Sequence, residues 1–371
     1  MRQAGSLVST REGAVGSPPL HYGNPLGEQK KLLAGESFVD LSDRAVITVT
    51  GPDRLTWLDS LTSQSLTGLQ PGDSAETLLL DPTGRLEHAM RVVDDGVTTW
   101  LLVDGAEGDA LAAWLDRMRF MLRVEIGTSD LRTVGVFDPT VVEPVETPVA
   151  ATLATIAAAP NTIPLIWRDP WSAVTPGGHQ YADASDHAYS DWTYREILVA
   201  PDADLSALPA SGTLALEALR IAAWRPRLST EADEKTIPHE LDWLRSAVHL
   251  NKGCYRGQET IAKVHNLGHP PRRLVLLHLD GSEGVLPEAG AEVLRGDDVV
   301  GKVTSAALHY DLGPVALAVI KRNVDPSLTL TVAAEVPMAA AQETIVPTDA
   351  GAEANVPRLP RLGAVKRPAS A

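Results

Sequence analysis

The sequence changes character at Arg273, where a mixture of helix and strand patterns gives way to strands alone. The later segments are short, apolar or alternating, and separated by turn residues, which is the pattern of half-buried strands. Gly296-Asp297-Asp298 suits a hairpin connection. Several short strands in succession predict a small closed barrel. The expected strands cover residues 274–279, 291–294, 299–305 and 315–320.

The first third of the chain mixes both kinds of element with short connections. Pro52 stands where the first turn of a helix is expected, and Asp81-Pro82-Thr83-Gly84 is a good turn between two strands. Strands interleaved with helices in this way predict an α+β domain. The expected strands cover residues 45–50, 77–80, 86–93, 98–103 and 123–126, and the expected helices begin at Gly51-Pro52-Asp53 and run over 106–118.

The middle of the chain is less regular. Residues 139–160 are rich in Val, Thr, Ala, Pro and Glu and are expected to form a surface insertion. Residues 164–167 and 196–199 are expected as strands and 213–224 as a helix. Residues 265–271 are expected to be a linker. His265 and His269 have a spacing that suits a metal on a helix, but Gly268 and the double proline argue against a helix, so no metal site is expected.

Composition narrows the classes of protein further. A chain of 371 residues is long enough for two or three domains. Its formal net charge of -16 argues against a broad nucleic-acid-binding surface. A single cysteine excludes an intramolecular disulfide and a cluster held by four thiolates of this chain. There is no membrane-length apolar run and no signal-peptide pattern, so we expect a cytoplasmic protein.

The only cysteine lies in Asn251-Lys252-Gly253-Cys254-Tyr255-Arg256-Gly257-Gln258-Glu259-Thr260. Lys252 and Arg256 would favour the thiolate, which is the reactive form. A helix beginning near Gly257 would place its positive end close to the sulfur. The glycines on either side of the cysteine, Gly253 and Gly257, allow a positive φ or a close approach to a ligand, and if Gly253 has a positive φ, Gly253→Val is expected to harm folding or binding. The alternative is that Cys254 is a small buried apolar residue without chemistry.

Lys252-Gly253-Cys254-Tyr255-x-Gly257-Gln258-Glu259 resembles the signature of the YgfZ family of folate-binding proteins, which are relatives of the glycine-cleavage T-protein, a tetrahydrofolate-dependent aminomethyltransferase. The resemblance extends more loosely from about residue 21 to about residue 346. It implies an α+β, three-domain, T-protein-like architecture, with mixed ferredoxin-like halves around a central channel and a C-terminal small β-barrel. The expected divisions are a flexible tail (1–19), a folate-binding region (20–268, with 52–130 forming one lobe), the barrel (269–347) and a disordered tail (348–371).

The resemblance also implies site residues. Cys254 is expected to carry the function, with Lys252 beside it. A pterin is flat and has amide-like edges, so it needs an apolar slot and a few polar partners. The expected stacking faces are Tyr255, Trp224 and Tyr22, the expected partners of the ring edge are Glu231 and Gln258, and the expected contacts of the glutamate tail are Arg220, Arg225 and Lys252.

Two functions stay open from the sequence. The first is a tetrahydrofolate-binding accessory factor in the assembly or repair of iron–sulfur proteins, with iron–sulfur client proteins as partners. The second is a tetrahydrofolate-dependent aminomethyl or methyl transferase. T-proteins use a carboxylate in a Gly-x-x-Asp-Asp segment, which here reads Gly84-Arg85-Leu86-Glu87-His88. Glu87 and His88 would have to carry the transfer chemistry. A third possibility is a binding module without a cofactor.

Overall fold

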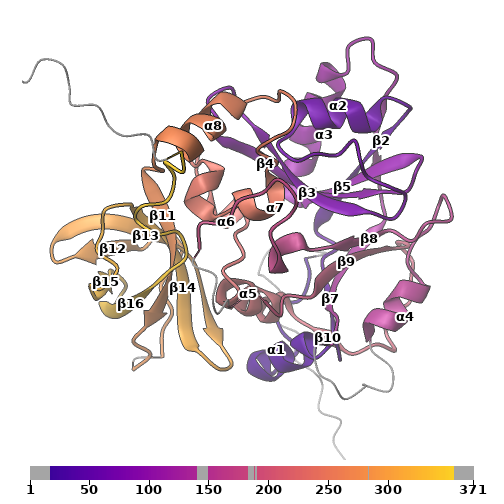
Figure 1. The fold of residues 1–371 in the computed structure, drawn as a ribbon. Coiled ribbons are helices and arrows are strands. Elements are labelled where there is room, and N and C mark those ends of the chain that lie inside the picture. Colours follow the sequence, from indigo (N-terminus) through magenta and orange to yellow (C-terminus); the bar gives the residue numbers. More distant parts are fainter. Residues whose placement is uncertain (1–16, 140–148, 183–187, 189, 283, 355–371) are drawn as a thin grey trace, which may run out of the picture.

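The computed structural model describes residues 17–139, 149–182, 188, 190–282 and 284–354. These residues form two five-stranded sheets and a closed barrel (Figure 1). Most of the expected N-terminal tail and of the expected C-terminal tail lies outside the described residues. No helix in the described ranges is long and apolar enough to cross a membrane.

The first sheet has the strand order β3-β4-β5-β2-β6, and all its neighbouring strands are antiparallel. Its expected strands and helices are present, but two bounds differ from the prediction. The last strand begins at Glu125 and runs to Ser129. The helix α2 begins at Arg54 with Asp53 as its N-cap, so the expectation that Pro52 stands in its first turn is wrong. One face packs against α2 and α3 through buried Leu58, Leu111 and Leu115. The elements are β2 (Arg44–Thr50), α2 (Arg54–Leu61), β3 (Ser74–Leu80), β4 (Leu86–Asp94), β5 (Thr98–Asp104), η1 (Gly105–Glu107), α3 (Gly108–Met118) and β6 (Glu125–Ser129).

The second sheet has the order β10-β1-β7-β9-β8. The expectation of a surface insertion over residues 139–160 is wrong for its last part, because Val149, Ala150 and Leu153 of α4 are buried in the core of this sheet. The elements are α1 (Pro25–Leu33), β1 (Phe38–Asp40), β7 (Arg132–Phe137), α4 (Val149–Thr155), β8 (Ile166–Arg168), η2 (Pro170–Ser172), β9 (Tyr194–Val199), β10 (Ala210–Ser211) and α5 (Thr213–Ala222).

Short helices connect the sheets to the barrel. The expected linker over residues 265–271 is wrong for its first part, because His265, Asn266 and Leu267 form the last turn of α8 and the helix ends at Gly268. The C-terminal segment returns to this end, where the Glu353 backbone nitrogen donates to the His265 carbonyl at 2.9 Å. The elements are α6 (Leu228–Glu231), η3 (Pro238–Leu241), α7 (Leu244–Ala247) and α8 (Gln258–Leu267).

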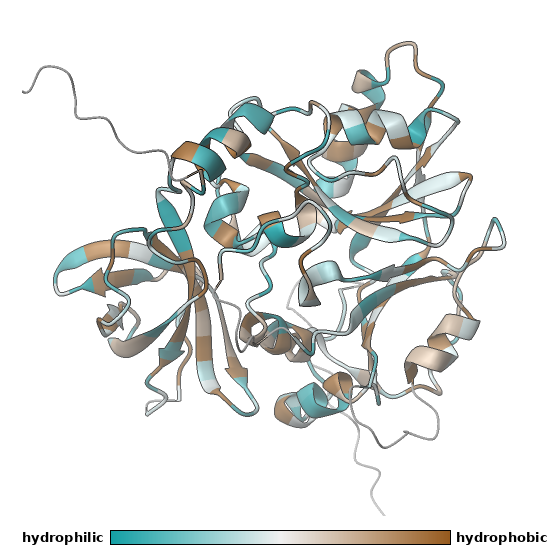
Figure 2. Ribbon diagram, viewed as in Figure 1, coloured by the Kyte–Doolittle hydropathy of each residue, from teal (hydrophilic) through white to brown (hydrophobic). Residues whose placement is uncertain are grey.

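The barrel closes in the order β11-β14-β13-β12-β15-β16, which confirms the expected C-terminal barrel. Hydrophobic and hydrophilic residues alternate along several of its strands (Figure 2). On β11, Val275 and Leu277 fill the barrel, while Leu274 and Leu276 join a core shared with the two sheets. The strands are β11 (Arg272–Leu279), β12 (Glu292–Arg295), β13 (Asp298–His309), β14 (Gly313–Lys321), β15 (Leu330–Val332) and β16 (Met338–Thr344).

Candidate functional site

The loop between α7 and α8 exposes its cysteine. Cys254 is a free, exposed thiol, and Gly253 beside it is also exposed. A Cβ added at Gly253 would meet no heavy atom within 4 Å among the described residues. Of the two glycines, Gly257 has the left-handed backbone, with φ +83°, and Gly253 does not, so the condition for a harmful Gly253→Val is not met. Because the Cys254 side chain is exposed, the alternative of a buried cysteine is wrong, whereas the reactivity of the thiol stays a prediction.

Lys252 anchors one side of this loop. Its ammonium donates to the carbonyls of Asp59, Thr62 (2.9 Å) and Gln64 (2.7 Å), at and just beyond the C-terminal end of α2. Burial lowers the pKa of Lys252, and the Asp59 carboxylate, 3.3 Å away, acts in the opposite direction. An ammonium has three donors, so these carbonyls occupy its hydrogen-bonding capacity. The residue expected to act beside the thiol therefore holds the loop on α2.

Arg256 anchors the other side. Its guanidinium pairs with Glu87 at the start of β4 and lies over the Trp114 ring of α3, 5.6 Å from the ring centroid. His88 pairs with Glu107 at 3.0 Å. The structure thus brings the two segments selected from the sequence together, the cysteine loop and the Gly84–His88 segment.

Glycine makes this approach possible. Gly84 and Gly257 have φ values of +82° and +83°. A Cβ on Gly257 would lie 2.6 Å from the Asp81 carbonyl oxygen, and one on Gly84 would lie 2.7 Å from Thr260 Cβ. Both positions therefore need glycine for backbone conformation and for space.

Tyr255 and Gln258, both expected to bind folate, have local partners. Tyr255 is buried, and Lys252 Nζ lies 5.4 Å from its ring centroid. Burial raises the pKa of Tyr255, and its hydroxyl has no hydrogen-bond partner among the described residues. The Gln258 amide donates to the Lys252 carbonyl at 3.4 Å.

Arg220 and Glu231 tie the barrel to the sheets. Arg220 donates to Glu231 at 2.8 Å and to Ser305 of β13 at 2.8 Å. Glu231 also accepts from Thr304 at 3.1 Å. Since both charged groups are buried and paired, they form a bridge between α5, α6 and the barrel. Their expected role in folate binding stays a prediction.

The aromatic residues expected to stack on the pterin lie in different surroundings. Trp224 is buried, and its backbone is left-handed with φ +58°. Tyr22 is half-buried, its backbone nitrogen donates to Glu28 at 2.8 Å, and burial raises the pKa of its hydroxyl.

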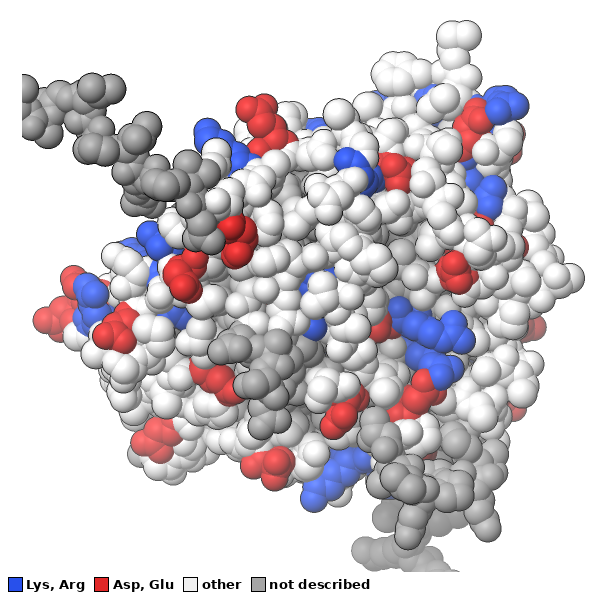
Figure 3. Space-filling model, in the orientation of Figure 1, with Lys and Arg blue, Asp and Glu red and all other residues white. Residues whose placement is uncertain are grey.

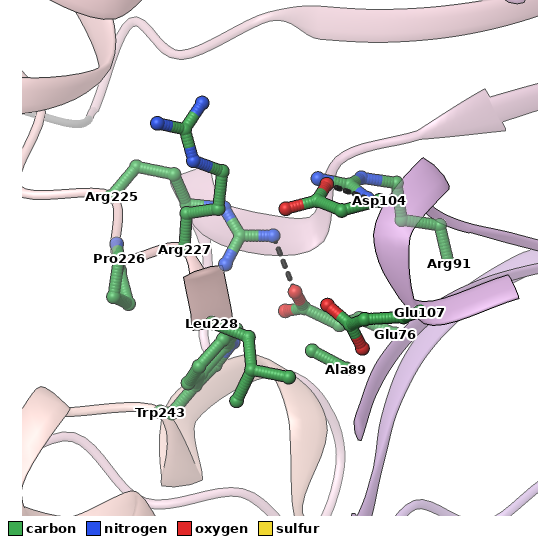
Figure 4. Close-up of a pocket in the computed structure, with 10 residues that line it drawn as sticks. All are labelled: Glu76, Ala89, Arg91, Asp104, Glu107, Arg225, Pro226, Arg227, Leu228 and Trp243. Atoms are coloured by element: carbon green, nitrogen blue, oxygen red, sulfur yellow. Dashed lines mark hydrogen bonds and ion pairs between the residues drawn. The ribbon is translucent and has the colours of Figure 1, made fainter. Parts of the chain in front are cut away.

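A small cavity of about 20 Å³ lies beside the buried guanidinium of Arg225, between the first sheet and the segment before α6 (Figure 4). Arg225 pairs with Glu76 and with Asp169, 3.0 Å away, and lies over the rings of Trp171 and Trp243. Burial alone would lower the pKa of Arg225, but Asp169 and Glu76 raise it above its usual range. The cavity is lined by Glu76, Ala89, Arg91, Asp104, Glu107, Arg225, Pro226, Arg227, Leu228 and Trp243.

Of the expected site residues, Arg225 alone lines this cavity, and Cys254 does not. Sequence reasoning missed its carboxylates. Glu76 is the one signal that could have been used, because it is the charged residue of β3 and stands shortly before three leucines in that strand. Asp104 and Glu107 stand at a strand end and in a short helix, where charges are ordinary.

Comparisons with known proteins agree with this architecture. Residues 272–347 match the glycine cleavage T-protein C-terminal barrel domain. The chain is 25% identical to an aminomethyltransferase of a Nostoc species over 331 residues, 81% of each chain. It is 26% identical to the aminomethyltransferase of Streptomyces avermitilis over 315 residues, 81% of this chain and 82% of that protein.

The crystal structure of the glycine cleavage system aminomethyltransferase T from Bartonella henselae superimposes with a TM-score of 0.70 at 18% identity, covering 93% of this chain and 95% of that one. The chain therefore has the T-protein fold, and in sequence it is similar to aminomethyltransferases.

Proposed function

We propose that this chain is a tetrahydrofolate-binding accessory factor of the YgfZ type, which serves the assembly or repair of iron–sulfur proteins through Cys254. The observation that carries the proposal is the exposed thiol of Cys254, in a loop fixed by Lys252 on one side and by Arg256 on the other. A fixed, accessible sulfur can contact a metal centre or a thiol on another protein. One thiolate cannot hold a cluster alone, so the contact with a client is transient.

The resemblance to T-protein supports the folate part, and the Arg225 cavity is the place to test it. Its chemistry suits a pterin, because Arg225 Nη1 is buried without a partner among the described residues and carboxylates face the same space. Trp243 offers a flat face. Its volume does not suit a pterin, since ligand pockets measure roughly 300–1,000 Å³. Binding there requires the lining side chains to move apart.

The second candidate is tetrahydrofolate-dependent aminomethyl or methyl transfer, which the names of the relatives favour. In this reading Glu87 or His88 handles the proton. Glu87 is paired with Arg256, however, and His88 with Glu107. Both groups would have to leave these partners before acting on a substrate, which weakens this alternative.

A titration and a complementation assay separate the two functions. Tetrahydrofolate should quench the intrinsic tryptophan fluorescence of the full chain saturably. In a strain lacking the protein, Cys254→Ser should abolish iron–sulfur enzyme activity while leaving quenching unchanged. Asn251→Ser in the same exposed loop is the control and should restore full activity. Loss of function only in Glu87→Gln/His88→Gln would establish transfer chemistry instead, and absence of quenching would remove the folate part.

A further inference from the structure

Three consecutive large apolar side chains are exposed in the turn that follows α3. Phe120, Met121 and Leu122 are 80%, 98% and 44% exposed, and we call them the α3 tip. A single exposed leucine is ordinary on a protein surface, but a run of three large apolar residues in water is not. Such patches mark interaction sites.

The tip is held outward by its own backbone. Phe120 has a left-handed backbone with φ +45°, which is uncommon for an aromatic residue. The Leu122 nitrogen donates to the Arg119 carbonyl at 2.9 Å, and the Val124 nitrogen to the Leu122 carbonyl at 3.0 Å. Strain of this kind persists only where the surroundings fix it, and it concentrates at functional positions.

The next residue fastens the turn to the segment between β2 and α2. The Arg123 backbone and guanidinium both donate to Asp53, each at 3.0 Å, and the Arg123 carbonyl packs directly on Gly51. The apolar side chains are therefore presented by a fixed turn, so little ordering is left for binding to impose.

Charged residues of both signs surround the tip. Arg119 pairs with Asp116 at 3.0 Å, and Arg123, whose side chain is 72% exposed, pairs with Asp53. Arg117, exposed in the last turn of α3, adds a further positive charge. Figure 3 shows an uncharged protrusion at this end of the molecule with Lys or Arg atoms near its base. Aromatic residues, methionine and arginine are the types that anchor protein interfaces.

The loop that contains Cys254 lies near the same helix. It covers residues 248–257 between α7 and α8, and we call it the thiol loop. Trp114, on α3, contacts Arg256 of that loop, and Met118 ends the helix about 6 Å further along its axis. Lys252 fastens the loop to α2, which packs beside α3 (Figure 1). A protein seated on the α3 tip would therefore lie beside the helix that the thiol loop contacts.

We propose that the α3 tip docks the client protein, through an apolar pocket on the client. The inference rests on the proposed function, since it names the surface by which the client of Cys254 is held. Position favours this occupant, because α3 also contacts the thiol loop through Trp114 and Arg256. An anionic bilayer is a poorer match, since the chain carries a net charge of -16 and both Arg119 and Arg123 are paired with carboxylates.

Variants in the full chain test the docking. Phe120→Asp/Met121→Asp should lower client iron–sulfur enzyme activity at least ~10-fold in a strain lacking the protein, a change equivalent to ~1.4 kcal/mol of binding. Aspartate tolerates the left-handed backbone at residue 120, so the melting temperature should be unchanged. Tetrahydrofolate quenching and the reaction of Cys254 with a neutral thiol reagent should also be unchanged. Val97→Asp, at an exposed valine in the turn between β4 and β5, is the matched control and should retain activity.

Crosslinking identifies the occupant. A benzoylphenylalanine at residue 121 should give an adduct with an iron–sulfur protein in cells, and the same probe at residue 97 should not. Full client activity in the tip variant, an adduct containing only two copies of this chain, or flotation of the protein with anionic lipid vesicles that depends on the tip would each overturn the docking proposal.

The two proposals can fail separately. Full activity of Cys254→Ser would refute the proposed function, whatever the tip variant does. A tip variant that keeps full activity while Cys254→Ser loses it would refute the docking surface and leave the proposed function in place.

Discussion

Charged residues have opposite surroundings in the thiol loop and in the Arg225 network, by which we mean Arg225 with Glu76 and Asp169. In the thiol loop, Lys252 is bound to backbone carbonyls and Arg256 to Glu87, and the Cys254 side chain between them is left in solvent. In the network, the guanidinium of Arg225 and the carboxylates of Glu76 and Asp169 are buried against one another.

The contrast separates supporting groups from reactive ones. Buried ions that are paired with one another hold their segments in one geometry. Removing one ion leaves its partners charged and unpaired in the low-dielectric interior, which is strongly destabilising. A solvent-exposed thiol contributes little to stability, so the fixed loop that holds Cys254 points to a role in function and not in folding. Substitutions in the two regions should therefore differ in their effect on stability.

Arg225→Met should have the largest effect. Glu76 and Asp169 would keep buried carboxylates without their cation, so the free energy of unfolding should fall by about 3–5 kcal/mol. Urea denaturation measures this loss. The matched control is Arg295→Met, because the exposed pair of Arg295 with Asp298 should contribute less than ~1 kcal/mol. Equal losses for the two variants would contradict the division.

Gly257→Ala should come next. The new Cβ would meet the Asp81 carbonyl oxygen at 2.6 Å with a backbone at φ +83°, so we expect a loss of about 2 kcal/mol. Thermal unfolding and the reaction rate of Cys254 with a neutral reagent measure the effect on the fold and on the loop.

Gly253→Ala is the control for Gly257→Ala in the same loop. Its Cβ would enter open space from an ordinary backbone, so stability should change by less than ~0.5 kcal/mol. If the two alanine variants behave alike, Gly257 does not fix the loop.

The pH dependence of stability should expose two effects that oppose each other and partly cancel. Burial lowers the pKa of His239 to about 3, so folding favours the neutral ring and stability falls as pH drops below ~6.5. Burial raises the pKa of Asp242 to about 7, so folding favours the protonated acid and stability falls as pH rises from ~3.8 to about 7. The two slopes oppose each other between pH ~4 and ~6.5.

Single variants should separate these slopes. Asp242→Asn removes the destabilising effect of ionising Asp242. The difference in unfolding free energy between this variant and the unaltered protein should therefore increase with pH, by up to ~1.4 kcal/mol per pH unit across this range. His239→Asn should show the opposite difference. Urea denaturation at a series of pH values measures both, and parallel curves for all three proteins would exclude the assignment.

Cys254→Ser should have only a small effect on stability. An exposed thiol has few packing contacts to lose, so the unfolding free energy should stay within ~1 kcal/mol of the original. Denaturant unfolding checks this beside the complementation assay. A loss above 2 kcal/mol would mean that the sulfur supports the fold.

Most of the secondary structure could be predicted from the sequence, because turn residues and apolar periodicity act locally. The Asp81–Gly84 turn and the Gly296–Asp298 hairpin are both confirmed. The errors have local causes as well. Gly268 and two prolines signal a helix end, and the prediction placed that end one turn too early. An alanine-rich stretch at residues 149–155 has the composition of a loop insertion but packs on β7.

The site was harder to predict because its geometry depends on distant segments. Either Gly253 or Gly257 could have had the left-handed backbone. Gly257 has it, where Gly84 and Asp81 of a distant segment pack closely against it. Arg220 and Glu231 have the residue types that bind a ligand, but the barrel supplies Thr304 and Ser305 as their partners. No local pattern contains that information.

Closure of the barrel has a consequence for self-association. Every strand of the barrel is paired on both sides, so it offers no free backbone edge for another chain to extend. The outer strands β3, β6, β8 and β10 of the two open sheets are where unwanted strand addition could begin. If the protein partly unfolds, aggregation should therefore begin at the outer strands of the two open sheets, and the barrel should be the last part to take part in it.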